Sequence, residues 1–146
     1  ARHTESFVHS PIAIIDKRRD EEGIVKAEHV IGEVKNKTAV LVDDIIDTAG
    51  TITEAADILK KEGAKEIYVL ATHPVLSGPA IERLQSSEIR EIIVTNTIEL
   101  PKEKKIGKIR IISIAPLLAE TIKRQHEGTS MGAVYDKLYE KLRKKP

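Results

Sequence analysis

The sequence predicts an α/β fold built on a doubly wound, mostly parallel sheet. Short aliphatic runs alternate along the chain with segments of helical period, and Gly, Pro and polar residues separate them. The strongest run, Thr38–Asp43, is continuously aliphatic before its acidic end, which is typical of a parallel strand covered on both faces. A chain of 146 residues is the size of one ordinary domain.

The chain before this strand carries two weaker strand patterns. The apolar run Ile12–Ile15 follows Pro11 and predicts a buried strand. The stretch from Arg18 to about Lys26 is dense in charge and has no period, which predicts a mobile loop. A further strand is expected around His29–Val34.

The chain after this strand alternates helices and strands. Thr51 and Glu54 have the spacing of a capping box, so we expect a helix to begin there and to end at Gly63. Later strands are expected at Ile67–Ala71, Ile92–Thr95 and Ile109–Ile114, and later helices at Ala80–Leu84, Pro116–Gln125 and Ala133–Arg143.

The composition excludes several classes of function. The 24 Lys and Arg residues against 23 Asp and Glu give a net charge of +1, which provides no overall attraction for nucleic acid or an anionic membrane. Without cysteine the chain has no disulfide, thiolate nucleophile or Cys-ligated zinc. No apolar stretch approaches the roughly 20 residues of a membrane span, and the first residues lack the apolar region of a signal peptide. We expect a cytoplasmic protein.

The end of the Thr38–Asp43 strand carries the candidate site, because ligands of open α/β sheets bind beyond the carboxyl ends of the strands. Two adjacent carboxylates, Asp43 and Asp44, are costly to desolvate without a partner, and sugar hydroxyls or a hydrated Mg²⁺ would supply one. The turn 47–51 then precedes a helix whose free N–H groups suit a phosphate. The pattern indicates a phosphorylated-sugar site; the alternative is a strand followed by a solvated helix cap.

Other polar segments give weaker signals. Taken alone, the Lys17–Arg19 run is a solvated charge run neutralised by the acids that follow it. His73 has no further metal ligands at a suitable spacing, which favours a structural role. Ser77–Pro79 and Thr95–Thr97 follow predicted strands and are expected to line the same site. The phosphate-binding patterns G-x-x-x-x-G-K-[ST] and G-x-G-x-x-G are both absent.

At this point the chain resembles a known family. V-L-V-D-D-I-I-D-T-A-G-T is similar to the phosphoribosyl pyrophosphate (PRPP) motif of type I phosphoribosyltransferase folds. From about Pro11 to Gly128, four further motifs resemble the C-terminal half of bacterial ribose-phosphate pyrophosphokinases, the PRPP synthetases. They are P-I-A-I-I-D-K-R-R, T-H-P-V-L-S-G-P-A, V-T-N-T-I and P-L-L-A-E-T-I-K-R-Q-H-E-G.

The resemblance implies an enzyme that transfers diphosphate from Mg-ATP to ribose 5-phosphate, giving PRPP and AMP. It implies Mg²⁺ as cofactor and a homo-oligomer, a hexamer in this family. Lys17 and Arg19 would be the catalytic cations at the base of a flexible loop. Asp43 and Asp44 would hold the ribose hydroxyls and their Mg²⁺, directly or through water. The 5-phosphate would be wrapped by Asp47, Thr48, Ala49, Gly50 and Thr51.

The resemblance also sets the expected domain organisation. Residues 1–128 would be the phosphoribosyltransferase-like C-terminal domain without its first strand, and 129–146 a helical tail that departs from the family. ATP recognition would lie in an N-terminal half or in neighbouring subunits, so we expect the isolated chain to be inactive. Two alternatives stay open: a nucleobase phosphoribosyltransferase, and a non-catalytic regulatory subunit associated with PRPP synthetase.

Overall fold

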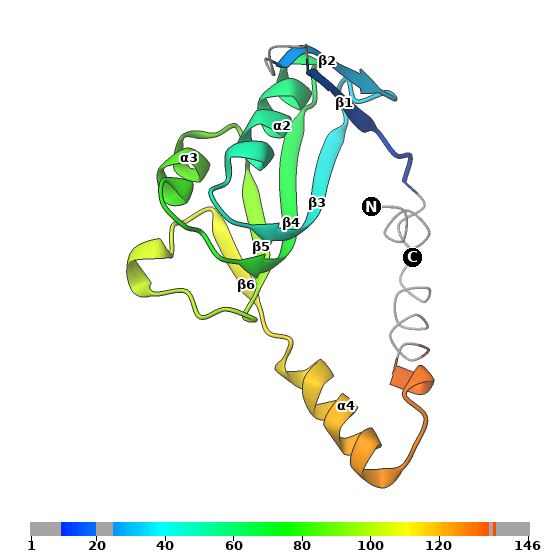
Figure 1. Cartoon of the computed structure of the whole chain (residues 1–146). Helices are drawn as coiled ribbons and strands as arrows, with labels where there is room; N and C mark the ends of the chain where they lie inside the picture. Colours follow the sequence, from blue (N-terminus) through cyan, green and yellow to red (C-terminus); the bar gives the residue numbers. More distant parts are fainter. Residues whose placement is uncertain (1–9, 20–24, 135, 137–146) are drawn as a thin grey trace. The chain divides into compact units, whose positions relative to one another are not determined.

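The computed structural model describes residues 10–19, 25–134 and 136. The chain divides into two units, one from Pro11 to Ile112 and one that contains the helix after it. The elements of the first unit are β1 (Ile14–Arg19), β2 (Val25–Ile31), β3 (Thr38–Ile46), α2 (Gly50–Lys61), β4 (Glu66–Pro74), α3 (Ala80–Ser86), β5 (Glu91–Thr95), the short 3-10 helix η1 (Lys102–Lys104) and β6 (Ile109–Ile112) (Figure 1).

A parallel sheet of four strands forms the centre of the first unit. Its strand order is β3-β4-β5-β6, so each strand lies next to the one that precedes it in the sequence. Crossovers between neighbouring parallel strands are right-handed, and a sheet built in one direction therefore receives its helices on one face. Figure 1 shows α2 and α3 on the same side of the sheet. The predicted α/β fold with a parallel sheet is confirmed.

The core between helices and sheet is aliphatic. Along β4, buried Ile67 and Val69 alternate with half-buried Tyr68 and Leu70, which is the period of a strand with one face fully covered. The buried side of α2 repeats at helical spacing and packs on that face. Its core residues are Ile52, Ala56 and Leu59, joined by Ala80 and Leu84 of α3 and by Ile92 and Val94 of β5.

The first two strands differ from their predicted form. β1 and β2 pair antiparallel with each other in a separate two-stranded sheet, and Ile14 and Ile31 are 56% and 59% exposed. The predicted burial of the strand at Ile12–Ile15 is therefore wrong. The predicted loop is wrong at both of its ends, because Arg18 and Arg19 belong to β1 and Val25 and Lys26 to β2, while residues 20–24 lie outside the described residues. β1 continues into charged residues because the hydrogen bonds of the hairpin are made by the backbone and do not depend on the charge of the side chains.

Helix α2 also begins earlier than the sequence predicts. Ala49 is its N-cap and Gly50 its first residue, so the prediction that Thr51 caps the helix is wrong. The physical reason is the left-handed backbone of Ala49 (φ 61°, ψ 4°), which turns the chain into the helix before Thr51. The predicted end is confirmed, since Gly63 has φ +86° and donates its N–H to Lys60 O at 3.0 Å.

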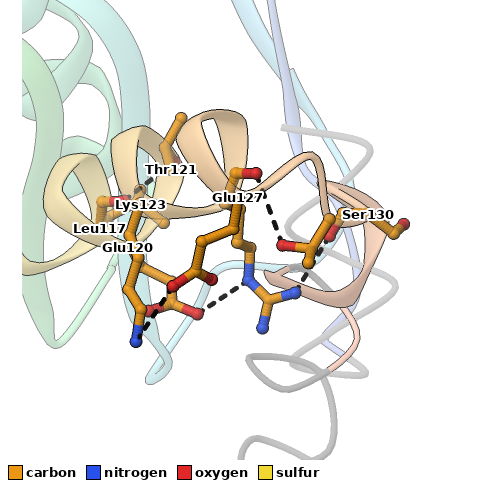
Figure 2. A network of polar contacts seen from close by, with 8 residues as sticks. Leu117, Glu120, Thr121, Lys123, Glu127 and Ser130 are labelled. Carbon is orange, nitrogen blue, oxygen red and sulfur yellow. Dashed lines mark hydrogen bonds and ion pairs between the residues drawn. The ribbon is translucent and has the colours of Figure 1, made fainter.

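The second unit contains α4 (Ala115–Glu127), with Pro in its first turn and left-handed Gly128 after its last residue. Arg124 holds this end together: its Nε bonds to Glu120 at 2.7 Å and its Nη1 donates to Ser130 O at 3.1 Å. Lys123 pairs with Glu127 in the same network (Figure 2). The predicted helix Ala133–Arg143 lies mostly outside the described residues. Among those residues no helix has the length and apolarity to span a membrane.

Because the core lies on one face of the sheet, the same substitution should lower the free energy of unfolding by different amounts on neighbouring strands. Val69→Ala, at a fully buried position, should lower the free energy of unfolding by about 2 kcal/mol, because it removes two methyl groups and leaves a cavity. Val40→Ala is the matched control, since Val40 is 51% exposed on β3. Urea denaturation measures both. An equal loss for the two variants would contradict a core confined to one face.

Candidate functional site

The loop between β3 and α2 has an unusual backbone. β3 ends in buried Ile46, and the chain reaches Gly50 through the left-handed Ala49. Residues other than Gly rarely adopt a positive φ, and such conformations gather at functional sites. A left-handed residue beside right-handed ones turns successive N–H groups to one side, which creates a concavity suited to anions.

Every backbone carbonyl from Ile46 to Gly50 accepts a hydrogen bond from another part of the chain. Each of these carbonyl oxygens is therefore engaged by a donor within the protein. Ile46 O accepts from Leu76 N (3.0 Å), Asp47 O from Ser77 N (3.0 Å), Thr48 O from Arg83 Nη1 (3.0 Å), Ala49 O from Thr53 N (3.1 Å) and Thr53 Oγ1 (2.9 Å), and Gly50 O from Thr53 Oγ1 (3.0 Å).

The amino end of α2 supplies the donors. The first N–H groups of a helix have no partner within the helix, and Ala49 has no side chain that could cap them. The first turn of α2 contains no acidic residue that would compete for these donors. The helix dipole adds a partial positive charge at the same place. Loop and helix end together can therefore bind a phosphate through backbone N–H groups.

Asp43 and Asp44 lie within β3, which continues to Ile46, and both are exposed. The prediction that the strand ends at Asp43 is therefore wrong, because Ile45 and Ile46 extend the ladder with β4. Asp43 is in register with Ala71, and the N–H of Asp44 donates to Asp43 Oδ1 at 2.9 Å. Because consecutive side chains of a strand point to opposite faces, the pair offers one carboxylate on each face. Each face of β3 therefore presents one carboxylate to a ligand with free hydroxyls, such as a sugar.

The same two carboxylates fit a magnesium ion only with help from other ligands. Carboxylate oxygens suit Mg²⁺, which keeps several water molecules when it binds to proteins. Among the described residues no group of three His, Cys, Asp or Glu side chains is placed to hold a metal. Asp43 and Asp44 thus fit a partly hydrated ion whose remaining ligands come from water or from a bound sugar.

The segment after β4 lies directly against the phosphate-binding loop. The hydroxyl of Ser77 donates to the Asp47 carboxylate, and Arg83 of α3 reaches Thr48. Ser77 was expected near the site, and this placement agrees with the expectation. Arg83 is the residue that the sequence did not reveal, because it is an ordinary helix surface position 35 residues away from its partner.

A second polar cluster occupies the carboxyl ends of β4 and β5. The hydroxyls of Thr95 and Thr97 both donate to Thr72 O, at 2.7 and 2.9 Å. His73 Nδ1 lies 3.0 Å from Thr97 Oγ1, which agrees with the structural role expected for this histidine. The cluster links the ends of the two strands at the edge of the sheet that carries the site.

The two catalytic cations implied by the resemblance belong to the hairpin. Lys17 is in register with Glu28 and Arg19 with Val25, within the antiparallel pair β1-β2. In Figure 1 the hairpin lies at the end of the sheet where β3 begins, whereas the loop after β3 lies at the opposite end. The structure does not bring these residues together with Asp43–Thr51, and their catalytic role stays a prediction.

Comparison with known proteins identifies the family. The model of the family described as "Phosphoribosyl synthetase-associated domain" matches residues 15–136. The chain belongs to this family. The match includes nearly all of the β1-β2 hairpin, the acidic pair and the loop after β3, so the site described above lies within the matched residues.

Curated relatives and a solved structure agree with this result. The chain is 55% identical over 136 residues to a ribose-phosphate pyrophosphokinase of Bacillus caldolyticus and 52% identical over 135 residues to that of Bacillus subtilis. Each alignment covers at least 92% of this chain and 43% of the relative, so the chain spans less than half of their length. The crystal structure of phosphoribosylpyrophosphate synthetase from Mycobacterium smegmatis superimposes with a TM-score of 0.78 at 42% identity, over 87% of this chain and 42% of that one.

The left-handed backbone of Ala49 predicts that the stability of the protein depends strongly on the shape of the side chain at this position. Ala49→Val should lower the free energy of unfolding by about 1–3 kcal/mol, because a β-branched residue is strained at positive φ. Ala49→Gly is the control and should stay within about 1 kcal/mol of the parent, since Gly adopts this conformation freely. Urea denaturation measures both variants. An unchanged stability of Ala49→Val would show that the loop is not held in this form.

Proposed function

We propose that this chain provides the ribose 5-phosphate site of a ribose-phosphate pyrophosphokinase. The observation that carries the proposal is the loop after β3, whose five carbonyls are all occupied while the uncapped end of α2 leaves N–H donors free for an anion. The relatives are named ribose-phosphate pyrophosphokinases. The reaction we propose is the transfer of diphosphate from ATP to ribose 5-phosphate, in the cytoplasm.

The site divides the sugar phosphate between two groups of residues. The 5-phosphate binds to the loop Asp47–Thr51 and the start of α2, through N–H groups and the hydroxyls of Thr48 and Thr51. The ribose hydroxyls bind to Asp43 and Asp44, whose carboxylates accept hydrogen bonds from vicinal hydroxyls. Mg²⁺, when bound, neutralises charge on the phosphate oxygens and is held by the same carboxylates, directly or through water.

The reaction itself needs positioning more than covalent help. The anomeric oxygen of ribose 5-phosphate forms a bond to the β-phosphorus of ATP, the bond from that phosphorus to the α–β bridging oxygen breaks, and AMP leaves while the hydroxyl proton passes to solvent. Fixed cations stabilise the charge that develops on the phosphoryl oxygens. By resemblance to the family, we assign these cations to Lys17 and Arg19 of the β1-β2 hairpin.

ATP and further subunits complete the proposed enzyme. The chain has four aromatic residues and no nucleotide-binding glycine pattern, so adenine is recognised outside it, in the remaining length of the protein or in neighbouring subunits of a homo-oligomer. A nucleobase phosphoribosyltransferase would share the phosphate-binding loop. It would release pyrophosphate from PRPP in the presence of a purine base, which the proposed enzyme does not do.

Removing one carboxylate of the pair tests the proposed site. Asp44→Asn should raise the dissociation constant for ribose 5-phosphate with Mg²⁺ at least about tenfold, because charged hydrogen bonds to the sugar are worth roughly 1.5–3 kcal/mol. Calorimetric titration of the 146-residue chain measures the effect. Asp57→Asn, an exposed carboxylate on α2, is the matched control and should leave binding unchanged. Equal affinities for the two variants would refute the proposed sugar site.

The proposed role of the hairpin predicts a different kinetic pattern. In the full-length enzyme, Lys17→Ala should lower kcat by about 100-fold or more while the KM for ribose 5-phosphate changes little, because the cation acts on the transferring group. Steady-state assays of AMP release measure both constants, with the exposed Lys65→Ala as control. A kcat equal to that of the parent enzyme would remove Lys17 from the mechanism.

A further inference from the structure

We propose that Ser77 and Arg83 are positioning residues that hold the phosphate-binding loop Asp47–Thr51 in its anion-binding form. This inference rests on the proposed function, because it concerns the same site. Neither residue belongs to the loop, and both act on it from the segment between β4 and the end of α3.

Two groups of donors occupy the loop carbonyls. Thr53, one turn into α2, occupies the carbonyls of Ala49 and Gly50. Among the described residues, the donors to the three preceding carbonyls come from the segment after β4, as Leu76 N, Ser77 N and Arg83 Nη1. Without these donors, the first half of the loop could turn its carbonyl oxygens toward a phosphate and repel it.

Asp47 places a carboxylate in the loop. A carboxylate within a phosphate-binding loop repels a bound dianion by simple electrostatics. The hydroxyl of Ser77 donates to Asp47 Oδ1, and the N–H of Ser77 donates to Asp47 O at 3.0 Å. These two bonds fix both the side chain and the backbone of Asp47. Ser77 therefore determines where the negative charge of the loop lies.

Arg83 places a positive charge at the amino end of α2. Its Nη1 lies 3.2 Å from the position that a Cβ on Gly50 would occupy, so the guanidinium covers the first residue of α2. The same nitrogen donates to Thr48 O at 3.0 Å, which fixes this placement. A bound phosphate would interact favourably with both the guanidinium and the positive end of the helix dipole. The glycine at position 50 leaves room for Arg83.

Calorimetric titration of the 146-residue chain with ribose 5-phosphate and Mg²⁺ tests the inference. Arg83→Met should raise the dissociation constant about tenfold, and Ser77→Ala about threefold to tenfold, since each removes a bond that fixes the loop. Arg83→Lys should recover part of the loss, because its ammonium can still donate to Thr48 O. If Arg83 acted only through packing, the lysine variant would not restore the affinity for ribose 5-phosphate.

Two matched controls accompany these variants. Arg90→Met removes an exposed arginine that pairs with Glu66 at the beginning of β4, and Ser86→Ala removes a hydroxyl that bonds only to carbonyls of α3. Both should bind ribose 5-phosphate within about twofold of the parent chain, because neither residue contacts the loop. Thermal unfolding of all variants separates loss of binding from loss of folding.

The outcomes distinguish the inference from the proposed function. If the parent chain binds neither ribose 5-phosphate nor inorganic phosphate, the proposed function fails and this inference fails with it. If the parent chain binds and Asp44→Asn weakens binding, but Arg83→Met and Ser77→Ala match the parent, only the positioning role is overturned. If Arg83→Met does not fold, Ser77→Ala and Arg83→Lys decide the question by the same measurement.

Discussion

The occupation of five consecutive carbonyls between β3 and α2 is the constraint on which the rest of the site depends. A backbone can offer N–H groups to an anion only if its carbonyl oxygens are satisfied elsewhere. Here Thr53 satisfies two of them from within α2, and the segment after β4 satisfies the other three.

The parallel sheet makes this arrangement possible. Because β3 and β4 are neighbours and run in the same direction, the loops that follow them leave the sheet side by side. Leu76 and Ser77 can then bond to Ile46 and Asp47 as a continuation of the ladder between the strands. The aliphatic core under α2 and α3 keeps both helices on one face, which brings Arg83 within reach of Thr48.

The sequence predicted the parts of this fold whose signals are local. The aliphatic run of β3, the acidic pair and the glycine after α2 each have a short pattern with a direct physical meaning. The left-handed Ala49 could not be predicted, because alanine does not favour positive φ and the bonds that hold it come from residues 76, 77 and 83. The hairpin was missed because apolar Ile12–Ile15 suggested burial, whereas the strand continues into charged residues through pairing with β2.

The backbone origin of the phosphate site has a consequence for how this protein tolerates change during evolution. In the proposed site the hydroxyls of Thr48 and Thr51 bind the anion together with the backbone, so these positions are restricted by direct contact. Behind the loop, Leu76 donates through its backbone N–H, which any residue except proline can supply, whereas Ser77 and Arg83 also act through their side chains. We therefore expect natural variation to be wider at position 76 than at positions 77 and 83, although none of the three touches the phosphate.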